Sequence, residues 1–215
     1  MQEKQPNLEM AQNVRKERKL IWSCICQPDD QIPVDPVTQL ANWDCPDALD
    51  FDRLRETLEY VRRHGGQLPP GYDSTEVRNT HDGSSLVPED TIQSTRALMA
   101  NHKDDLFVLV DGFLLYYDPA LTAEFDVKLF YTASYDTLKY RRENRKGYTT
   151  TDGYWVDPPG YFDKIVWPEY VRWNKPFVDQ DNQKREETLI IDTDKHTIVQ
   201  AIEATTHKIL DSLLE

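Results

Sequence analysis

The stretch Leu106-Phe107-Val108-Leu109-Val110-Asp111-Gly112 decides the fold class of this 215-residue chain. Its first five residues form an unbroken apolar run, which is typical of a strand buried on both faces of a parallel sheet. The Asp-Gly pair that follows is a turn signal and ends the strand. A strand of this kind predicts an α/β fold, in which helices cover both faces of a parallel sheet.

Helical and strand patterns alternate along the chain on either side of this stretch, as expected for a parallel sheet with crossover helices. Asp47 is expected to cap a helix that begins near Ala48, and Gly65-Gly66 would end it. Three further strands are expected, at 19–26, 126–131 and 188–192. Helices are expected at 48–64, 91–102, 134–146, 161–178 and 195–214.

The charge of the chain limits its partners. It carries 38 acidic and 25 basic residues, for a net charge of −13. An acidic surface repels phosphodiester backbones, so nucleic acid is not expected as a partner. The same surface tolerates a cationic small molecule.

The cysteines and the apolar runs indicate the compartment. Three cysteines, at positions 24, 26 and 45, do not form the even, spaced framework of a secreted disulfide-rich protein. No run approaches the roughly 18 apolar residues of a membrane span. The apolar segment 20–26 is too short and too far from the start for a signal peptide. A cytoplasmic protein without a membrane partner is expected.

Asp111 and a basic cluster are candidates for phosphate chemistry. A carboxylate at the carboxyl end of a parallel strand lies where α/β folds bind ligands, and phosphate-transfer enzymes hold Mg²⁺ there. Asp111-Gly112 is equally compatible with a simple turn. Arg141 and Arg145 are four residues apart and would share one face of a helix. Guanidinium groups on that face suit a lid that closes over phosphates. A solvated helix end is the alternative, because basic residues also favour the C-terminal dipole.

Two aromatic segments are candidates for ligand recognition. Asp44 could accept hydrogen bonds from two ribose hydroxyls, and Trp43 could stack on a flat ring. A core tryptophan beside a carboxylate is the alternative for this pair. In Asp157-Pro158-Pro159, the prolines predict a rigid turn into the next helix. The aromatic residues around that turn are typical of packing rather than binding.

Together and in this order, these segments resemble the nicotinamide riboside kinases, particularly the fungal ones. The resemblance runs from about Gln27 to the C-terminus. It divides the chain into a divergent segment, 1–26, and a nucleoside-kinase-like domain, 27–215, with a flap at about 67–90 and a lid at about 141–160. Three stretches carry it: Ile32-Pro33-Val34-Asp35 through Asn42-Trp43-Asp44-Cys45-Pro46-Asp47-Ala48-Leu49-Asp50-Phe51; Val110-Asp111-Gly112-Phe113-Leu114-Leu115; and Arg141-Arg142 through Tyr148, Trp155-Val156-Asp157-Pro158-Pro159 and Tyr161-Phe162-Asp163.

The resemblance implies a P-loop kinase fold and an enzymatic activity. Members of the family use ATP and Mg²⁺ to phosphorylate the 5′-hydroxyl of nicotinamide riboside, which makes nicotinamide mononucleotide for NAD synthesis. The implied partner is therefore a small-molecule riboside with a cationic pyridinium ring. A cation between aromatic faces gains about 1–2 kcal/mol when it is desolvated.

Residue by residue, the resemblance implies a substrate pocket and a catalytic group. Trp43 and Tyr148 match the positions that sandwich the ring, and Asp44 matches the carboxylate that binds the ribose. Asp111 matches the acid near Mg²⁺. The lid arginines contact the substrate and the phosphates, and they match Arg141, Arg142 and Arg145.

A phosphate loop is not found in this sequence. The motif G-x-x-x-x-G-K-[ST] needs a glycine directly before a lysine, and none of the eight glycines has one. The family's catalytic base falls at Ser23-Cys24, where no acid stands. The implied fold therefore has its first strand and phosphate loop missing or replaced. In the family that strand lies between those matching 106–110 and 126–131. Segment 19–26 could fill that slot or the edge beside 106–110, and its position in the chain favours the edge.

Three functional hypotheses follow. The first is a riboside kinase of this family. The second is a remnant that binds the riboside without transferring phosphate, because both the loop and the base are absent. The third is a relative of the uridine-type nucleoside kinases.

Overall fold

The computed structural model describes residues 19–22, 26–72, 86–145, 147–149, 154–178 and 187–214. Its strands are β1 (Lys19–Trp22), β2 (Val108–Asp111), β3 (Lys128–Thr132), β4 (Tyr148–Thr149), β5 (Tyr154–Trp155) and β6 (Thr188–Asp192). Its α-helices are α1 (Phe51–Arg63), α2 (Glu89–Leu98), α3 (Pro119–Thr122), α4 (Tyr135–Glu143), α5 (Trp167–Val178) and α6 (Ile198–Ser212). Short 3₁₀ turns cover Asp29–Gln31, Pro46–Ala48 and Ala100–His102, and a π-helix covers Phe162–Val166.

The strands form three pairs. β1 runs parallel to β2, and β3 runs parallel to β6, with Lys128 opposite Thr188. β4 and β5 form a small antiparallel ribbon. Parallel pairs mixed with helices confirm the expected α/β class. Within the described ranges, no strand pairing joins β2 to β3.

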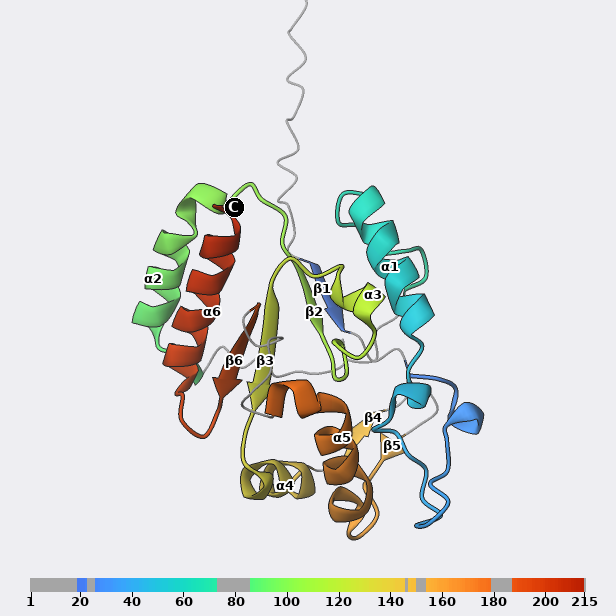
Figure 1. Cartoon of the computed structure of the whole chain (residues 1–215). Coiled ribbons are helices and arrows are strands. Elements are labelled where there is room, and N and C mark those ends of the chain that lie inside the picture. Colours follow the sequence, from blue (N-terminus) through green and yellow to red (C-terminus); the bar gives the residue numbers. More distant parts are fainter. Residues whose placement is uncertain are drawn as a thin grey trace, which may run out of the picture.

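β1 occupies the edge position that the sequence predicts. It pairs with β2, and in Figure 1 it lies on the side of β2 away from β3. The strand is shorter than expected, since its pairing with β2 ends at Trp22. Residues 23–25 lie outside the described part. Cys26 forms an isolated antiparallel bridge with Leu49 instead of extending the strand.

The facing edges of β2 and β3 are incompletely covered. Val108 and Leu109 on β2 are 37% and 48% exposed, and Tyr131 on β3 is 51% exposed. The expectation that 106–110 is buried on both faces is therefore wrong, because Val108 and Leu109 point to opposite faces and both are partly exposed. The Tyr116 hydroxyl lies 2.9 Å from both the N–H and the C=O of Leu129, accepting from one and donating to the other. A side chain thus satisfies part of the β3 edge.

Helix α1 and its neighbours form the main apolar core. Leu54, Leu58 and Val61 on α1 pack with Leu121 of α3, and Val110 of β2 joins them. In Figure 1, α1 and α3 lie beside β1 and β2, whereas α2 and α6 lie beside β6. None of the helices in the described ranges is long and apolar enough to cross a membrane.

The start of α1 differs from the sequence prediction. Asp47 lies in the 3₁₀ turn, and Asp50 caps the helix by accepting a 2.9 Å hydrogen bond from the N–H of Arg53. The assignment of Asp47 as the cap of the helix was wrong. Asp47 and Asp50 both precede the same apolar stripe, so the sequence pattern alone does not separate them. The predicted end is correct, since Gly65 and Gly66 follow with positive φ. Gly66 has a φ of 85°, which favours glycine, and a Cβ there would also force the end of the Leu106 side chain, 2.2 Å away, to shift.

The helix expected over 161–178 is partly a π-helix and partly an α-helix. Phe162–Val166 is π-helical, and α5 continues it from Trp167. The N–H of Trp167 bonds the C=O of Phe162, five residues earlier. Such wide turns are rare and often occur at functional sites.

Candidate functional site

The segment before Trp43 is folded back on itself. One carboxylate oxygen of Asp35 accepts hydrogen bonds from the N–H groups of Val37 and Thr38, at 3.1 and 2.7 Å. These bonds hold a tight turn, and Val34 and Ala41 form a bridge across it. The turn returns the chain so that the residues after Ala41 face α5.

Buried Asn42 joins this segment to α5. Its Nδ2 donates to Oε1 of Glu169 at 3.1 Å, and its Oδ1 accepts from the N–H of Asp44 at 3.1 Å. Its C=O accepts a 3.4 Å hydrogen bond from the Cys45 thiol. Asn42 therefore fixes the backbone of Asp44 relative to α5.

Tyr161 fixes the same segment from the start of the π-helix. It is only 1% exposed. Its hydroxyl donates to the C=O of Ala41 at 2.8 Å and accepts from the N–H of Trp43 at 3.2 Å. The backbone on either side of Asn42 is thus held by one phenol.

Three charged side chains meet beside this segment, and we call Asp44, Arg142 and Asp157 the Arg142 cluster. Arg142, near the end of α4, contacts Asp44 through Nη1–Oδ1 at 3.1 Å and Nη2–Oδ2 at 3.4 Å. It contacts Asp157 through Nε–Oδ2 at 2.6 Å and Nη2–Oδ1 at 3.3 Å. Each of the three side chains is largely buried. One planar guanidinium therefore bridges two carboxylates, a geometry that lysine could not reproduce.

Aromatic side chains line the cluster. The rings of Trp43 and Trp155 are 5.8 Å apart and tilted by 58°. Trp155 Nε1 donates to Oδ1 of Asp157 at 2.8 Å, and the guanidinium of Arg142 lies 5.8 Å from the Tyr161 ring. Trp43 Nε1 is buried, and none of the described residues accepts a hydrogen bond from it.

The electrostatics of the cluster favour a further positive charge. Burial raises the pKa of Asp44, the nearby Arg142 charge opposes the rise, and Asp157 adds to it. With both carboxylates ionised, the three side chains carry a formal sum of −1. An additional cation would therefore relieve a charge that is held away from water.

A hollow of about 370 Å³ adjoins the cluster. Arg142, Arg145, Asp157 and Tyr161 are among the residues that line it. Its volume falls in the range of small-molecule sites. Arg142, Arg145 and Asp157 thus face space that a small ligand could enter, whereas Trp43 and Asp44 do not line it.

The structure brings together part of the predicted site. Trp43, Asp44 and Arg142 meet as described above. The backbone of Tyr148 pairs with that of Trp155, next to Trp43, but the Tyr148 side chain lies outside the described part. The predicted ring sandwich therefore stays a prediction.

The three residues predicted for catalysis are not in this cluster. Arg141 donates to the Thr193 hydroxyl at 2.9 Å, and Arg145 lies beyond the end of α4 on the wall of the hollow. Their expected shared helix face is wrong, because α4 ends at Glu143. Asp111 ends β2 and is exposed, and none of its described contacts reaches Asp44 or Arg142.

Sequence reasoning missed two contributors. Asp157 was taken as part of a rigid turn, and Trp155 was taken as packing. The available signal was that Trp155 and Asp157 lie in one of the stretches that resemble the riboside kinases. Its partner Arg142 is 15 positions away, and local patterns do not report such a pairing.

The described residues fit Mg²⁺ in part and a triphosphate poorly. Asp111 offers one carboxylate, which suits an ion held mainly by phosphate oxygens and water. No group of three or more acidic, cysteine or histidine side chains in the described ranges could hold a metal by itself. The sequence has no G-x-x-x-x-G-K-[ST] motif to cradle phosphates.

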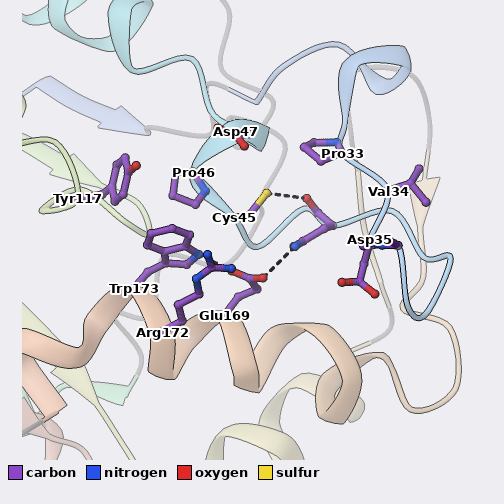
Figure 2. Close-up of a pocket in the computed structure, with 12 residues that line it drawn as sticks. Pro33, Val34, Asp35, Cys45, Pro46, Asp47, Tyr117, Glu169, Arg172 and Trp173 are labelled. Atoms are coloured by element: carbon purple, nitrogen blue, oxygen red, sulfur yellow. Dashed lines mark hydrogen bonds between the residues drawn. The ribbon is translucent and has the colours of Figure 1, made fainter.

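A second hollow, of about 300 Å³, lies between residues 33–47 and α5. Figure 2 shows Glu169, Arg172 and Trp173 on its helical wall, opposite Pro46. The Arg172 guanidinium lies 4.4 Å from the Trp173 ring centre. None of the predicted site residues lines this hollow. It is separate from the Arg142 cluster.

Comparison with known proteins identifies relatives. The chain is 39% identical over 143 residues to a nicotinamide riboside kinase of Schizosaccharomyces pombe, a match that covers 66% of the chain and 61% of the relative. Enzymes of the same name from Eremothecium gossypii and Saccharomyces cerevisiae are 38% and 33% identical, again over 66% of the chain, with 58% and 60% of the relative covered. No protein-family model matches the chain.

These matches are shorter than the resemblance expected from Gln27 to the C-terminus. The chain spans about three fifths of the length of the curated relatives it matches. The identity is nevertheless consistent across three separate fungal enzymes, and all three carry the same name. The chain belongs to the nicotinamide riboside kinase family.

Proposed function

We propose that this chain binds nicotinamide riboside at the Arg142 cluster and acts as a kinase on its 5′-hydroxyl. The observation that carries the proposal is the buried Asp44 carboxylate beside the Trp43 indole, within a cluster whose formal charge is −1. A pyridinium ring supplies the opposite charge and a flat face for an indole. The fungal relatives are named for the same substrate.

The proposed roles follow the chemistry of each side chain. Asp44 accepts hydrogen bonds from the ribose hydroxyls, and Trp43 and Tyr148 flank the ring. Arg142 contacts the sugar, because it already lies on Asp44. The lid, at about 141–160, brings Arg141 and Arg145 toward the phosphates.

ATP would supply the phosphoryl group, and Mg²⁺ would neutralise its charge. Asp111 is the proposed ligand of the ion. The sequence has no G-x-x-x-x-G-K-[ST] phosphate loop, so among the described residues the proposed contacts with ATP and Mg²⁺ are those of Asp111, Arg141 and Arg145.

The test is formation of nicotinamide mononucleotide by the purified chain with nicotinamide riboside, ATP and Mg²⁺. The Schizosaccharomyces pombe relative serves as the positive control. Asp44→Ala should abolish product formation while the chain remains folded. Absence of product from the unaltered chain, with an active control, would contradict the kinase proposal.

A second candidate function is riboside binding without phosphate transfer. The missing phosphate-loop motif favours it. Calorimetry separates the two candidates: a binder takes up nicotinamide riboside equally with or without ATP and Mg²⁺, whereas a kinase binds it more tightly with them. The same measurement with uridine as the ligand tests the uridine-type alternative, since uridine lacks the cationic ring. The cytoplasmic location stays a prediction.

A further inference from the structure

We propose that Asp157 is a positioning residue that holds Arg142, so that Asp44 can exchange Arg142 for ligand hydroxyl groups. This inference rests on the proposed riboside site. It adds a residue whose side chain acts through Arg142.

The two ends of the guanidinium are held unequally. The shortest contact in the cluster joins Nε of Arg142 to Asp157, at 2.6 Å. The contacts with Asp44 are 3.1 and 3.4 Å. Charge-assisted hydrogen bonds near 2.7 Å are the strong ones. Asp157 therefore holds the arginine more firmly than Asp44 does.

The geometry lets one contact change without the other. Arginine presents five N–H groups in a rigid fork, and the edge formed by Nε and Nη2 is distinct from the edge formed by Nη1 and Nη2. Asp157 uses the first edge, and Asp44 uses the second. Hydroxyl groups can replace the second edge at Asp44 while the first stays bonded.

Asp157 is itself fixed in place. Trp155 Nε1 donates to its Oδ1 at 2.8 Å. Pro158 follows directly and restricts the Asp157 backbone to extended conformations. A carboxylate fixed at both its side chain and its backbone is suited to hold a mobile arginine.

The first test needs no ligand. In the unliganded chain, exchange of the Arg142 Nε–H with solvent is measured by ¹⁵N NMR. Asp157→Asn should accelerate this exchange at least tenfold, whereas Asp44→Asn should leave it within about twofold, because Asp157 accepts from Nε and Asp44 accepts from Nη1 and Nη2. Equal acceleration by both substitutions would overturn the inference.

The second test measures nicotinamide riboside binding by calorimetry in a double-mutant cycle. Asp157→Asn should raise Kd about tenfold in the unaltered chain and less than about twofold in Arg142→Met, because its effect passes through the arginine. The same increase in both backgrounds, or none in either, would show that Asp157 does not act through Arg142.

Asp163→Asn is the matched control. Asp163 pairs with Lys139 at 2.6 Å, outside the cluster. This substitution should leave both the Nε–H exchange and Kd unchanged. If the unaltered chain fails to bind the riboside, the proposed function fails, and the exchange measurement still decides the role of Asp157.

Discussion

Side chains around Arg142 are paired and largely buried, whereas apolar side chains on β2 and β3 are exposed. The Arg142 cluster joins three segments that are far apart in the sequence. In a family-type sheet the first strand would lie between β2 and β3, and these two strands share no pairing in the described ranges. The contrast teaches that the proposed riboside site is built by residues 33–49, α4 and the segment 155–169. It does not require a continuous sheet.

The largest effect is expected at the cluster. Arg142→Met should lower the free energy of unfolding by about 3–5 kcal/mol, because two largely buried carboxylates lose their counter-charge. Urea unfolding at neutral pH measures the loss. The control is Arg141→Met, which removes an exposed hydrogen bond to Thr193 and should change stability by about 0.5 kcal/mol or less. Similar losses of stability in both variants would contradict the special contribution of the Arg142 cluster.

A matched pair of truncations compares the strands themselves. Ile191 on β6 is 1% exposed, and Leu109 on β2 is 48% exposed. Ile191→Ala should cost about 2–4 kcal/mol, and Leu109→Ala less than about 1 kcal/mol, because only the first leaves a cavity. Thermal and urea unfolding of both variants gives the difference. A large cost at Leu109 would show that β2 is covered in solution.

The Tyr116 hydroxyl tests how well the β3 edge is sealed. Tyr116→Phe leaves the N–H and C=O of Leu129 without their partner, and the expected cost is about 1–2 kcal/mol. Tyr117→Phe, at an exposed neighbouring tyrosine, is the control and should be close to neutral. A neutral Tyr116→Phe would mean that water replaces the phenol, and that the edge is open.

The smallest effect concerns the titration of Asp44. Burial raises its pKa, so NMR should place its midpoint above the ordinary value of about 3.9. A raised pKa in the folded state means that the contribution of Asp44 to stability falls as pH rises from the ordinary value through the raised one. Asp44→Asn should remove that fall. A midpoint below the ordinary value would show that Arg142 outweighs burial.

Local sequence patterns predicted most of the helices and strands, but not which of their side chains are buried. The strand expected at 188–192 is β6 itself, because Leu189–Ile191 is a continuous apolar run. The helix expected at 48–64 appears as α1, because its apolar residues recur with helical spacing. The exposure of Leu109 could not be read from its own apolar run, since burial depends on which neighbours are present.

The residues of the candidate site were likewise predicted only in part. Trp43, Asp44 and Arg142 were predicted from the family resemblance, and the structure brings them together. Asp157 was missed because its function arises from a contact with a residue on another element. An acid before two prolines has the local pattern of a turn, so only the fold distinguishes the two roles.

The π-helical turn at Phe162–Val166 makes the length of this segment critical. It contains one more residue than an α-helical turn would, and each residue rotates a helix by about 100°. Deleting a single residue there would swing Tyr161 away from Ala41 and Trp43 while leaving α5 on the sheet. Relatives that keep the phenol in register therefore need the same number of residues between it and α5, whatever their identity.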